Sequence, residues 1–344
     1  MNKKRGWLLL IIICLSMIGC GKQEVNKWEK PVVTANDTEK LVIYSPHNTD
    51  FIWPIVRKFE EENQISVEVI SDGTGTLLTR IEEEKENPGA DIIWGGTVSL
   101  LNSNKDLFEE YYSQNEQDLI KEYRNETGKV TSFTLVPSVL IVNTDLCGDM
   151  NIEGYEDLLD ERLKGKIAHC DPEKSSSAYE QVLNILNAMG RGNPENGWPY
   201  MEKLMNQLDG QLMTSSSSVY KSVVEGENMV GLTYEEGAVK NMLEGAPVKV
   251  VYMKEGVICR ADGAAIIKNA AHLENAKKFI DFITSKEAQE IAASQLSRRP
   301  IRDDVMLSEG ILPYAQINVL EDDVEWANEH KEEIIEKCNS YLNK

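Results

Sequence analysis

The chain has few of the residues with which enzymes do chemistry. Four histidines are spread over 344 residues, at His47, His169, His272 and His330. The sequence contains no GxSxG nucleophile elbow, no HExxH zinc motif and no GxxxxGK[ST] phosphate loop. We therefore expect no catalytic residues, no metal site and no cofactor. Hydrolysis of an organophosphate is the enzymatic alternative, and an assay for released product would detect it.

Cysteine is also scarce. Beyond Cys20, the cysteines are Cys147, Cys170, Cys259 and Cys338. They lie far apart and show neither CxxC nor metal-site spacing. Buried free thiols are one interpretation. A disulfide between some pair is the other, and the sequence alone leaves this choice open.

Positive charge is in the minority. Lysine and arginine number 36 against 57 acidic residues, so the formal net charge is −21. Loss of Lys3, Lys4 and Arg5 with a cleaved N-terminus changes −21 to −24. Such a charge argues against nucleic acid and against electrostatic binding to anionic lipid. An anionic ligand must therefore be held by local groups, because the overall field repels it.

Long hydrophobic runs are absent except at the N-terminus. There, a basic head precedes an apolar run of roughly a dozen residues, too short to span about 30 Å of hydrocarbon comfortably. Residues 1–19 are therefore predicted to be a signal peptide. The polar, aperiodic residues 20–39 are predicted to be a flexible linker.

The residues before this linker are Met17-Ile18-Gly19-Cys20. They resemble a bacterial lipobox, although Met17 stands where leucine is usual. The resemblance implies cleavage before Cys20 and lipid on its thiol, which anchors the chain on the outer face of the cell membrane. An ordinary signal, or a short anchor with an incidental cysteine, is the alternative.

Strand and helix patterns alternate after the linker. Strands are predicted at 41–44, 65–70 and 90–94, with helices at 49–63 and 77–86 between them. This alternation predicts a parallel sheet with crossover helices. Ligands of such sheets bind in the loops at the carboxyl ends of the strands.

Two extended segments predict passages between two lobes. Residues 133–143, with Pro137 inside, are interpreted as the chain crossing to a second lobe, and 263–267 as its return. The predicted fold class is α/β, with two lobes, each a central and mostly parallel sheet flanked by helices. The predicted boundaries are 40–137 plus 261–310 for lobe 1, 138–260 for lobe 2, and 311–344 for a C-terminal helical segment packing on the lobes. Two helices are expected within 273–294, and a single amphipathic helix at 322–342.

An ordered set of motifs then points to a known family. The set is Tyr44-Ser-Pro-His-Asn, Ala90-Asp-Ile-Ile-Trp-Gly-Gly, Leu135-Val-Pro-Ser-Val-Leu-Ile-Val-Asn, Leu163-Lys-Gly-Lys-Ile-Ala, Thr233-Tyr-Glu-Glu-Gly and Ala276-Lys-Lys-Phe-Ile-Asp-Phe-Ile-Thr-Ser-Lys-Glu-Ala-Gln. Together these motifs resemble the family 1 extracellular solute-binding proteins of ABC importers. The resemblance covers roughly residues 40–310. It implies the type II periplasmic-binding-protein fold, whose lobes close on a ligand like a hinge.

Within this family, the chain is most similar to the ferric-iron branch and its sugar-phosphate and phosphonate relatives. Ferric iron needs hard anionic oxygen, which the iron binders provide with adjacent tyrosines plus His or Glu. The matching stretch here has Tyr234 without a tyrosine neighbour in sequence, and Gly95-Gly96-Thr97 where an acid is often found. We therefore expect an organophosphate or phosphonate, with ferric iron as the alternative.

Hydroxyl and glycine clusters at predicted helix starts are the candidate anion sites. Helix N-termini present unpaired N–H groups and partial positive charge. Ordinary helix capping is the other interpretation of each cluster. The candidates are Ser45 and His47; Thr74, Gly75 and Thr76; Trp94, Gly96 and Thr97; and Ser175, Ser176 and Ser177 after Lys174.

Further candidates lie in the crossing segment, in lobe 2 and near Pro300. Glu235 and Glu236 are the expected acids of the cleft, placed to orient the polar tail of the ligand; a solvated pair is the other interpretation. Either Arg298 or Arg299 is expected to clamp the anion, and Arg299 is the candidate we favour. Exposure of these arginines at the surface is the alternative. The remaining candidates are Ser138, Ser217 and Tyr234. Ser217 lies in the run Ser215–Ser218, which is either another donor loop or a solvated linker.

The partners follow from the resemblance. It implies a membrane permease and an ATPase, and we expect a monomer that binds no nucleic acid. A lipoprotein that senses a ligand for a two-component system is the alternative. Neighbouring genes would distinguish the two roles.

Overall fold

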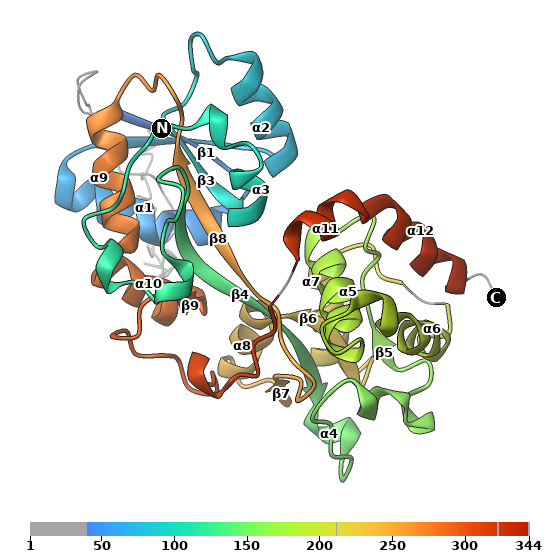
Figure 1. The fold of residues 1–344 in the computed structure, drawn as a ribbon. Coiled ribbons are helices and arrows are strands. Elements are labelled where there is room, and N and C mark those ends of the chain that lie inside the picture. Colours follow the sequence, from blue (N-terminus) through green and yellow to red (C-terminus); the bar gives the residue numbers. More distant parts are fainter. Residues whose placement is uncertain (1–39, 211, 322, 343–344) are drawn as a thin grey trace, which may run out of the picture. The chain divides into compact units, whose positions relative to one another are not determined.

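The computed structural model describes residues 40–210, 212–321 and 323–342 (Figure 1). The predicted signal peptide, Cys20 and the linker 20–39 lie outside the described residues. Within the described residues, no helix combines the length and the apolar character needed to cross a membrane.

The first part of lobe 1 is the predicted alternation of strands and helices. It comprises β1 (Lys40–Ser45), α1 (Thr49–Asn63), β2 (Ser66–Ser71), α2 (Thr74–Glu83) and β3 (Ile92–Thr97). Strand β1 lies between β2 and β3 and is parallel to both. The carboxyl ends of these strands therefore meet at one edge of the sheet.

Helix α1 shows how local sequence sets this arrangement. The Asn48 side chain accepts a hydrogen bond from the Phe51 backbone N–H at 2.9 Å, which caps the helix start. Apolar residues at helical spacing then cover the face that is turned to the core. They are Phe51, Ile52, Ile55, Val56 and Phe59. The helix predicted at 49–63 is confirmed.

Two long strands connect the lobes. Strand β4 (Thr131–Asn143) pairs with β8 (Cys259–Ile266) along residues 131–137, and with β6 and β7 along 138–143. Figure 1 shows β4 and β8 running from one lobe into the other. A short strand, β9 (Arg299–Pro300), pairs with β4 at Thr134 and Leu135.

The sheet of lobe 2 contains β5 (Ile167–Ala168), β6 (Val230–Tyr234) and β7 (Val248–Val251). Strands β5 and β6 are parallel, whereas β6 and β7 are antiparallel to β4. This sheet is therefore mixed rather than mostly parallel, because the crossing strand β4 enters it against the direction of its neighbours. The helices of this lobe are α5 (Ser176–Met189), α6 (Trp198–Gln207), α7 (Ser216–Val224) and α8 (Glu235–Leu243).

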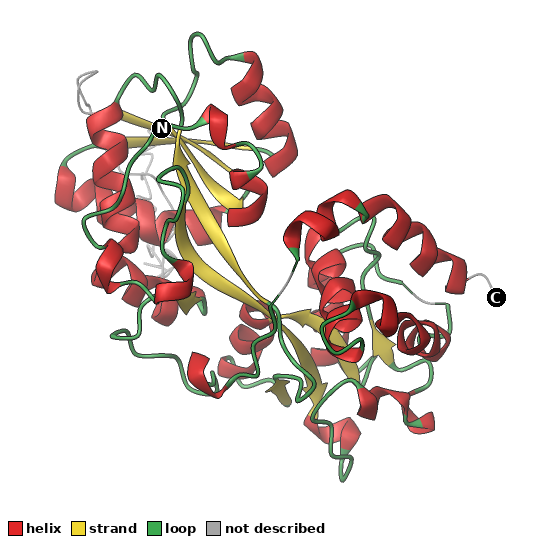
Figure 2. Cartoon of the chain, in the orientation of Figure 1, coloured by secondary structure: helices red, strands yellow, loops and turns green. Residues whose placement is uncertain are grey.

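Short helices fill the connections (Figure 2). The α-helical ones are α3 (Val98–Asn102) and α4 (Thr144–Cys147). The 3-10 turns are η2 (Lys105–Leu107), η3 (Glu116–Asp118), η4 (Lys121–Tyr123), η5 (Glu156–Leu159), η6 (Glu161–Leu163), η7 (Pro194–Gly197) and η8 (Tyr314–Gln316).

Helices α9 (Leu273–Thr284) and α10 (Lys286–Leu296) are the two predicted within 273–294. The single helix predicted at 322–342 is wrong in one respect. It is divided into α11 (Val324–Glu329) and α12 (Lys331–Leu342), because His330 adopts φ −101° and ψ 11°.

The C-terminal helices pack on lobe 2. Ala327, Ile334 and Cys338 belong to the same buried apolar cluster as Leu186 and Met201 of that lobe. Asp322, at the predicted start of the C-terminal helix, lies outside the described residues.

The four cysteines beyond Cys20 are buried free thiols, so no disulfide joins the described residues. Burial raises the pKa of Cys259 and that of Cys338 to about 12. The thiols are therefore protonated at neutral pH and behave as small apolar side chains.

Candidate functional site

A cavity of about 510 Å³ is lined by residues from both lobes. Lobe 1 contributes Pro46, His47, Asn48, Phe51, Val136 and Arg298; lobe 2 contributes Lys174, Ser175, Ser177, Thr214, Ser215, Ser216, Tyr234 and Glu236. The volume lies within the usual range for small-molecule sites.

The wall from lobe 2 is a cluster of serine hydroxyls at two helix starts. Ser175 caps α5 by accepting a hydrogen bond from Ala178 N at 3.3 Å, and Ser215 caps α7 by accepting one from Ser218 N at 3.2 Å. Hydrogen bonds also link the two helix starts, because Ser216 shares one with Ser175 and one, at 2.6 Å, with Ser177. Two positive helix ends and their hydroxyls therefore converge on the cavity.

The wall from lobe 1 combines the Phe51 ring with the imidazole of His47 and the guanidinium of Arg298. The His47 ring lies 4.1 Å from the Phe51 ring, and the Arg298 guanidinium lies 4.8 Å from the centre of the same Phe51 ring. The His47 Nε2 atom is 3.0 Å from Asp262 Oδ2. The Phe51 ring therefore holds both nitrogen-bearing side chains in place at the edge of the cavity.

One ion pair crosses between the walls. Arg298 Nε lies 2.6 Å from Glu236 Oε2, with side chains 12% and 21% exposed. Arg298 follows α10 of lobe 1, whereas Glu236 lies in the first turn of α8 in lobe 2. The pair is thus a contact between lobes inside the cavity.

Tyr234 lies next to this pair. Burial, followed by the negative charge of Glu236, raises the pKa of Tyr234 well above its usual value. Although Tyr234 has no tyrosine neighbour in the sequence, the structure brings the Tyr220 ring to 6.2 Å from its ring, edge to face.

A second arginine–glutamate pair lies outside the cavity. Arg299 and Glu235 are each 1% exposed, and their closest N–O distance is 2.5 Å. Arg299 also donates to the Leu312 carbonyl at 2.6 Å, and the Tyr252 hydroxyl donates to Glu235. The structure therefore places Arg298, not Arg299, at the cavity, because successive side chains of extended backbone point in opposite directions.

Two candidates, Ser45 at the end of β1 and Trp94 in β3, lie beneath His47. Ser45 is fully buried; its hydroxyl donates to the Trp94 carbonyl at 2.6 Å and accepts from His47 N at 3.3 Å. Trp94 is also fully buried, with its ring 5.5 Å from that of His47. Trp94 therefore does not form a wall of the cavity, although it packs beneath the histidine that does. Ser138, in β4, is buried.

The glycine and threonine candidates at the start of α2 and at the end of β3 lie next to each other. Gly96 has φ 96°, and a Cβ atom on it would lie 2.7 Å from Thr74 Cγ2. Thr97 caps α3 by accepting from Leu100 N at 3.3 Å. Gly75 and Thr76 are exposed. None of these residues is among the described residues that line the cavity.

The candidates that line the cavity are His47, Ser175, Ser177, Tyr234, Glu236 and Arg298. Ser215 and Ser216, from the serine run interpreted as either a donor loop or a linker, line it as well. The side chain of Ser176 lies outside the described part, and Ser217 bonds Ser215 at 3.2 Å but is not among the lining residues. The sequence analysis missed Phe51 because it also lies on the core-facing stripe of α1.

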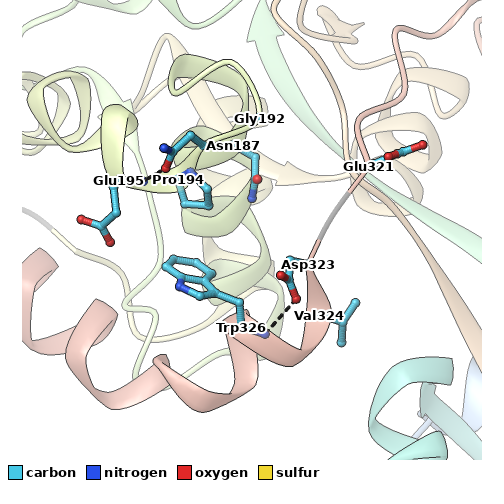
Figure 3. A pocket seen from close by; sticks show the side chains of 9 residues that line it. Asn187, Gly192, Pro194, Glu195, Glu321, Asp323, Val324 and Trp326 are labelled. Atoms are coloured by element: carbon cyan, nitrogen blue, oxygen red, sulfur yellow. Dashed lines mark hydrogen bonds between the residues drawn. The ribbon is translucent and has the colours of Figure 1, made fainter.

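Other hollows exist among the described residues. One of about 750 Å³ lies beside α11, where Trp326, Asp323 and Glu195 line it (Figure 3). Another, of about 560 Å³, lies between α2 and η2. Neither contains a residue of the serine cluster. No group of three or more His, Cys, Asp or Glu side chains in the described ranges is placed to hold a metal ion.

His169, which follows β5, is fully buried, and neither ring nitrogen has a hydrogen-bond partner. Burial lowers its pKa from 6.5 to about 4. The imidazole is therefore neutral at neutral pH, and it does not line the cavity.

Comparison with known proteins agrees with this architecture. A family model described as bacterial extracellular solute-binding protein matches residues 41–295. A probable ABC transporter periplasmic-binding protein, y4fP of Sinorhizobium fredii, is 23% identical over 275 residues, which are 78% of this chain and 76% of that protein.

Two solved structures are similar over almost their whole length. The periplasmic binding protein AfuA from Actinobacillus pleuropneumoniae, with exogenous fructose-6-phosphate bound, has a TM-score of 0.74 and 25% identity, and the match covers 88% of this chain and 98% of AfuA. A structure described as a two-component system protein that mediates signal transduction has a TM-score of 0.74 and 28% identity, with 86% and 99% covered.

Proposed function

Since the chain belongs to the bacterial extracellular solute-binding proteins, we propose that it captures a small organic anion for an ABC import system. The proposed ligand is an organophosphate, such as a sugar phosphate, or a phosphonate. It binds in the 510 Å³ cavity between the lobes. A permease and an ATPase in the membrane are the proposed partners, and the proposed state is a monomer.

One observation supports this class of ligand above others. The starts of α5 and α7 meet at the cavity, and Ser175, Ser177 and Ser216 hydrogen-bond one another there. A tetrahedral phosphate accepts several hydrogen bonds, and helix N-termini offer both donors and positive potential. Hydroxyls that now bond one another have the freedom to turn toward an arriving oxygen. The fructose-6-phosphate in AfuA supports the same class of ligand. The description of y4fP as a probable ABC transporter periplasmic-binding protein supports a role in import.

Each lobe supplies a basic side chain to the cavity, Arg298 from lobe 1 and Lys174 from lobe 2. Arg298 is a fixed guanidinium at the cavity, and the planar fork of such a group suits phosphate. Lys174 also lines the cavity. The net charge of −21 repels an anion at long range, so these local groups must hold it.

Ferric iron is the less favoured ligand. A ferric site binds tyrosine as phenolate, whereas burial and Glu236 raise the pKa of Tyr234. The cavity also presents more neutral hydroxyls than carboxylates, since Glu236 is the acid among the described residues that line it.

A sensory role is the second candidate. The solved two-component system protein is 28% identical over 86% of this chain. The same capture of an anion would then signal to a membrane histidine kinase. Genes for a permease and an ATPase beside this one support import, whereas genes for a kinase and a response regulator support sensing.

The proposed anchor is lipid on Cys20, which would hold the protein on the outer face of the cell membrane. The lipobox-like Met17-Ile18-Gly19-Cys20 and the polar linker after it support this proposal. Mass spectrometry of the mature N-terminal peptide is the test. A diacylglyceryl group on Cys20 is expected, and an unmodified or uncleaved N-terminus would contradict it.

Calorimetric titration tests the ligand class. Wild-type protein is titrated with fructose 6-phosphate, 2-aminoethylphosphonate, spermidine and ferric citrate. Binding of at least one phosphorus-containing ligand is expected. The double variant Ser177→Ala/Ser216→Ala should bind it roughly tenfold more weakly or worse, because hydrogen bonds to a charged group are lost. Ser340→Ala, on the exposed face of α12, is the matched control. Binding of ferric ion alone, with the colour of an iron phenolate, would refute the proposal.

A further inference from the structure

The basic side chains that line the cavity already have acidic neighbours. The pairs are Arg298–Glu236 at 2.6 Å, His47–Asp262 at 3.0 Å and Lys174–Asp171 at 3.6 Å. An anion that enters the cavity therefore finds an acidic side chain beside each of these three. It must compete with that acid for the basic group to which it binds.

The Arg298–Glu236 pair differs from the other two. Both of its members line the cavity, whereas Asp262 and Asp171 do not. It also joins the lobes, since Glu236 begins α8 and Arg298 follows α10. Glu236 thus contacts the Arg298 guanidinium, the group to which an anionic ligand between the lobes would bind.

Arg298 is held for such a role. Its guanidinium packs 4.8 Å from the centre of the Phe51 ring, and its side chain is 12% exposed. This contact fixes the position of the guanidinium beside Glu236. The guanidinium can thus exchange one oxyanion for another with little movement.

Glu236 in turn is held where a carboxylate is stable but replaceable. It lies in the first turn of α8, where the helix end favours negative charge. Its side chain is 21% exposed, so it can turn into the solvent of the cavity without being buried alone. Glu235, its neighbour, has no such freedom at 1% exposure.

We propose that Glu236 is a built-in counter-anion, which occupies Arg298 in the empty protein and is displaced by the anionic group of the ligand. This inference rests on the proposed function, since it presumes an anionic ligand in this cavity. Glu236 then sets a threshold for binding. A phosphate dianion offers the guanidinium more negative charge and more acceptor oxygens than one carboxylate does, whereas chloride or acetate does not. The chain thereby rejects weak anions at the expense of some affinity for its own ligand.

A double-mutant cycle tests this competition. Fructose 6-phosphate and inorganic phosphate are titrated calorimetrically into wild-type protein, Glu236→Gln, Arg298→Gln and the double variant. Glu236→Gln should bind fructose 6-phosphate roughly tenfold more tightly, because one opposing charge at this distance is worth about that much. Glu244→Gln, at the exposed opposite end of α8, removes the same formal charge and should leave the affinity unchanged.

The cycle separates competition from simple repulsion. Competition predicts that the gain from Glu236→Gln disappears when Arg298 is already Gln. A gain that persists there means that Glu236 merely repels the ligand, and overturns the inference. Equal or weaker binding by Glu236→Gln also overturns it, since Glu236 would then be inert or a ligand group, while the proposed function stands. If neither wild type nor Glu236→Gln binds either probe, both proposals fall.

Discussion

Two arginine–glutamate pairs join the same two segments of the chain and differ in their access to solvent. Arg298 pairs with Glu236 at the edge of the cavity, with side chains 12% and 21% exposed. Arg299 pairs with Glu235 one residue away, with both side chains 1% exposed. The chemistry of the two contacts is the same, but their surroundings are not.

This difference assigns the pairs different roles. The buried pair is completed by the Tyr252 hydroxyl and the Leu312 carbonyl, so its charges are satisfied within the protein. Charges in such a place cannot separate without a large desolvation penalty. The pair in the cavity can separate, because water or a ligand can take the place of either partner. The first is therefore part of the joint between the lobes, and the second is part of the proposed ligand site.

The largest expected effect comes from breaking the buried pair. Arg299→Met leaves Glu235 buried without a counter-charge, and we expect a loss of about 3–5 kcal/mol in the free energy of unfolding. Urea denaturation measures it. The double variant Arg299→Met/Glu235→Leu should recover most of this loss, because it removes both charges together.

A loss below about 1 kcal/mol for Arg299→Met would show that the buried pair is no more important to stability than a surface pair, and the comparison would fail. Failure of the double variant to recover stability would instead place the effect in packing around Tyr252.

A buried group without any partner gives the next largest effect. Burial lowers the pKa of His169 from 6.5 to about 4. The unfolded chain takes up this proton as the pH falls below about 6.5, whereas the folded chain does so near pH 4. Stability is thus present above pH 6.5 and lost between 6.5 and 4, by about 3 kcal/mol.

His169→Leu should remove this share of the acid sensitivity. The measurement compares urea unfolding of the wild type and the variant at pH 7 and at pH 4.5. A variant that loses as much stability as the wild type over this interval would mean that other groups cause the acid effect. The positive charge of a protonated His169 would then be tolerated in the interior without a counter-charge, unlike that of Arg299, which Glu235 balances.

The smallest expected effect on stability comes from the pair in the cavity. Arg298→Met should lower the free energy of unfolding by about 1 kcal/mol or less, because solvent screens the charge that remains on Glu236. The same variant should lose most of its affinity for an organophosphate. A loss of stability as large as that of Arg299→Met would remove the distinction between the two pairs.

Local signals in the sequence account for the parts of the fold that were predicted. Helix α1 was predicted at its observed bounds because an apolar stripe runs along it, and the structure adds that Asn48 caps its start. The division of the C-terminal helix at His330 was missed, because the amphipathic pattern continues across it. The sheet of lobe 2 is mixed because β4 runs antiparallel to β6, and no local sequence pattern predicts the direction of β4 relative to its neighbours.

Candidates that line the cavity were found where residue chemistry and a predicted helix start coincide in the sequence. The serines before α5 and α7 predict helix starts, and in the structure hydrogen bonds between serine hydroxyls join these two starts. Trp94 was placed wrongly as a wall, because the sequence cannot show that β3 is covered on the side of that ring. Which of Arg298 and Arg299 reaches the cavity depends on the direction in which one short extended segment points its side chains. The sequence cannot show this direction, because the two neighbouring residues are of the same type.

A crystal structure of the protein soaked with fructose 6-phosphate or 2-aminoethylphosphonate tests the central claim most directly. We predict that the phosphorus-bearing group lies within hydrogen-bonding distance of the Ser177 and Ser216 hydroxyls and of the Arg298 guanidinium, and that Glu236 has turned away from Arg298. A ligand bound elsewhere, such as in the cavity beside Trp326, or one that leaves the serine cluster unchanged, would contradict the account.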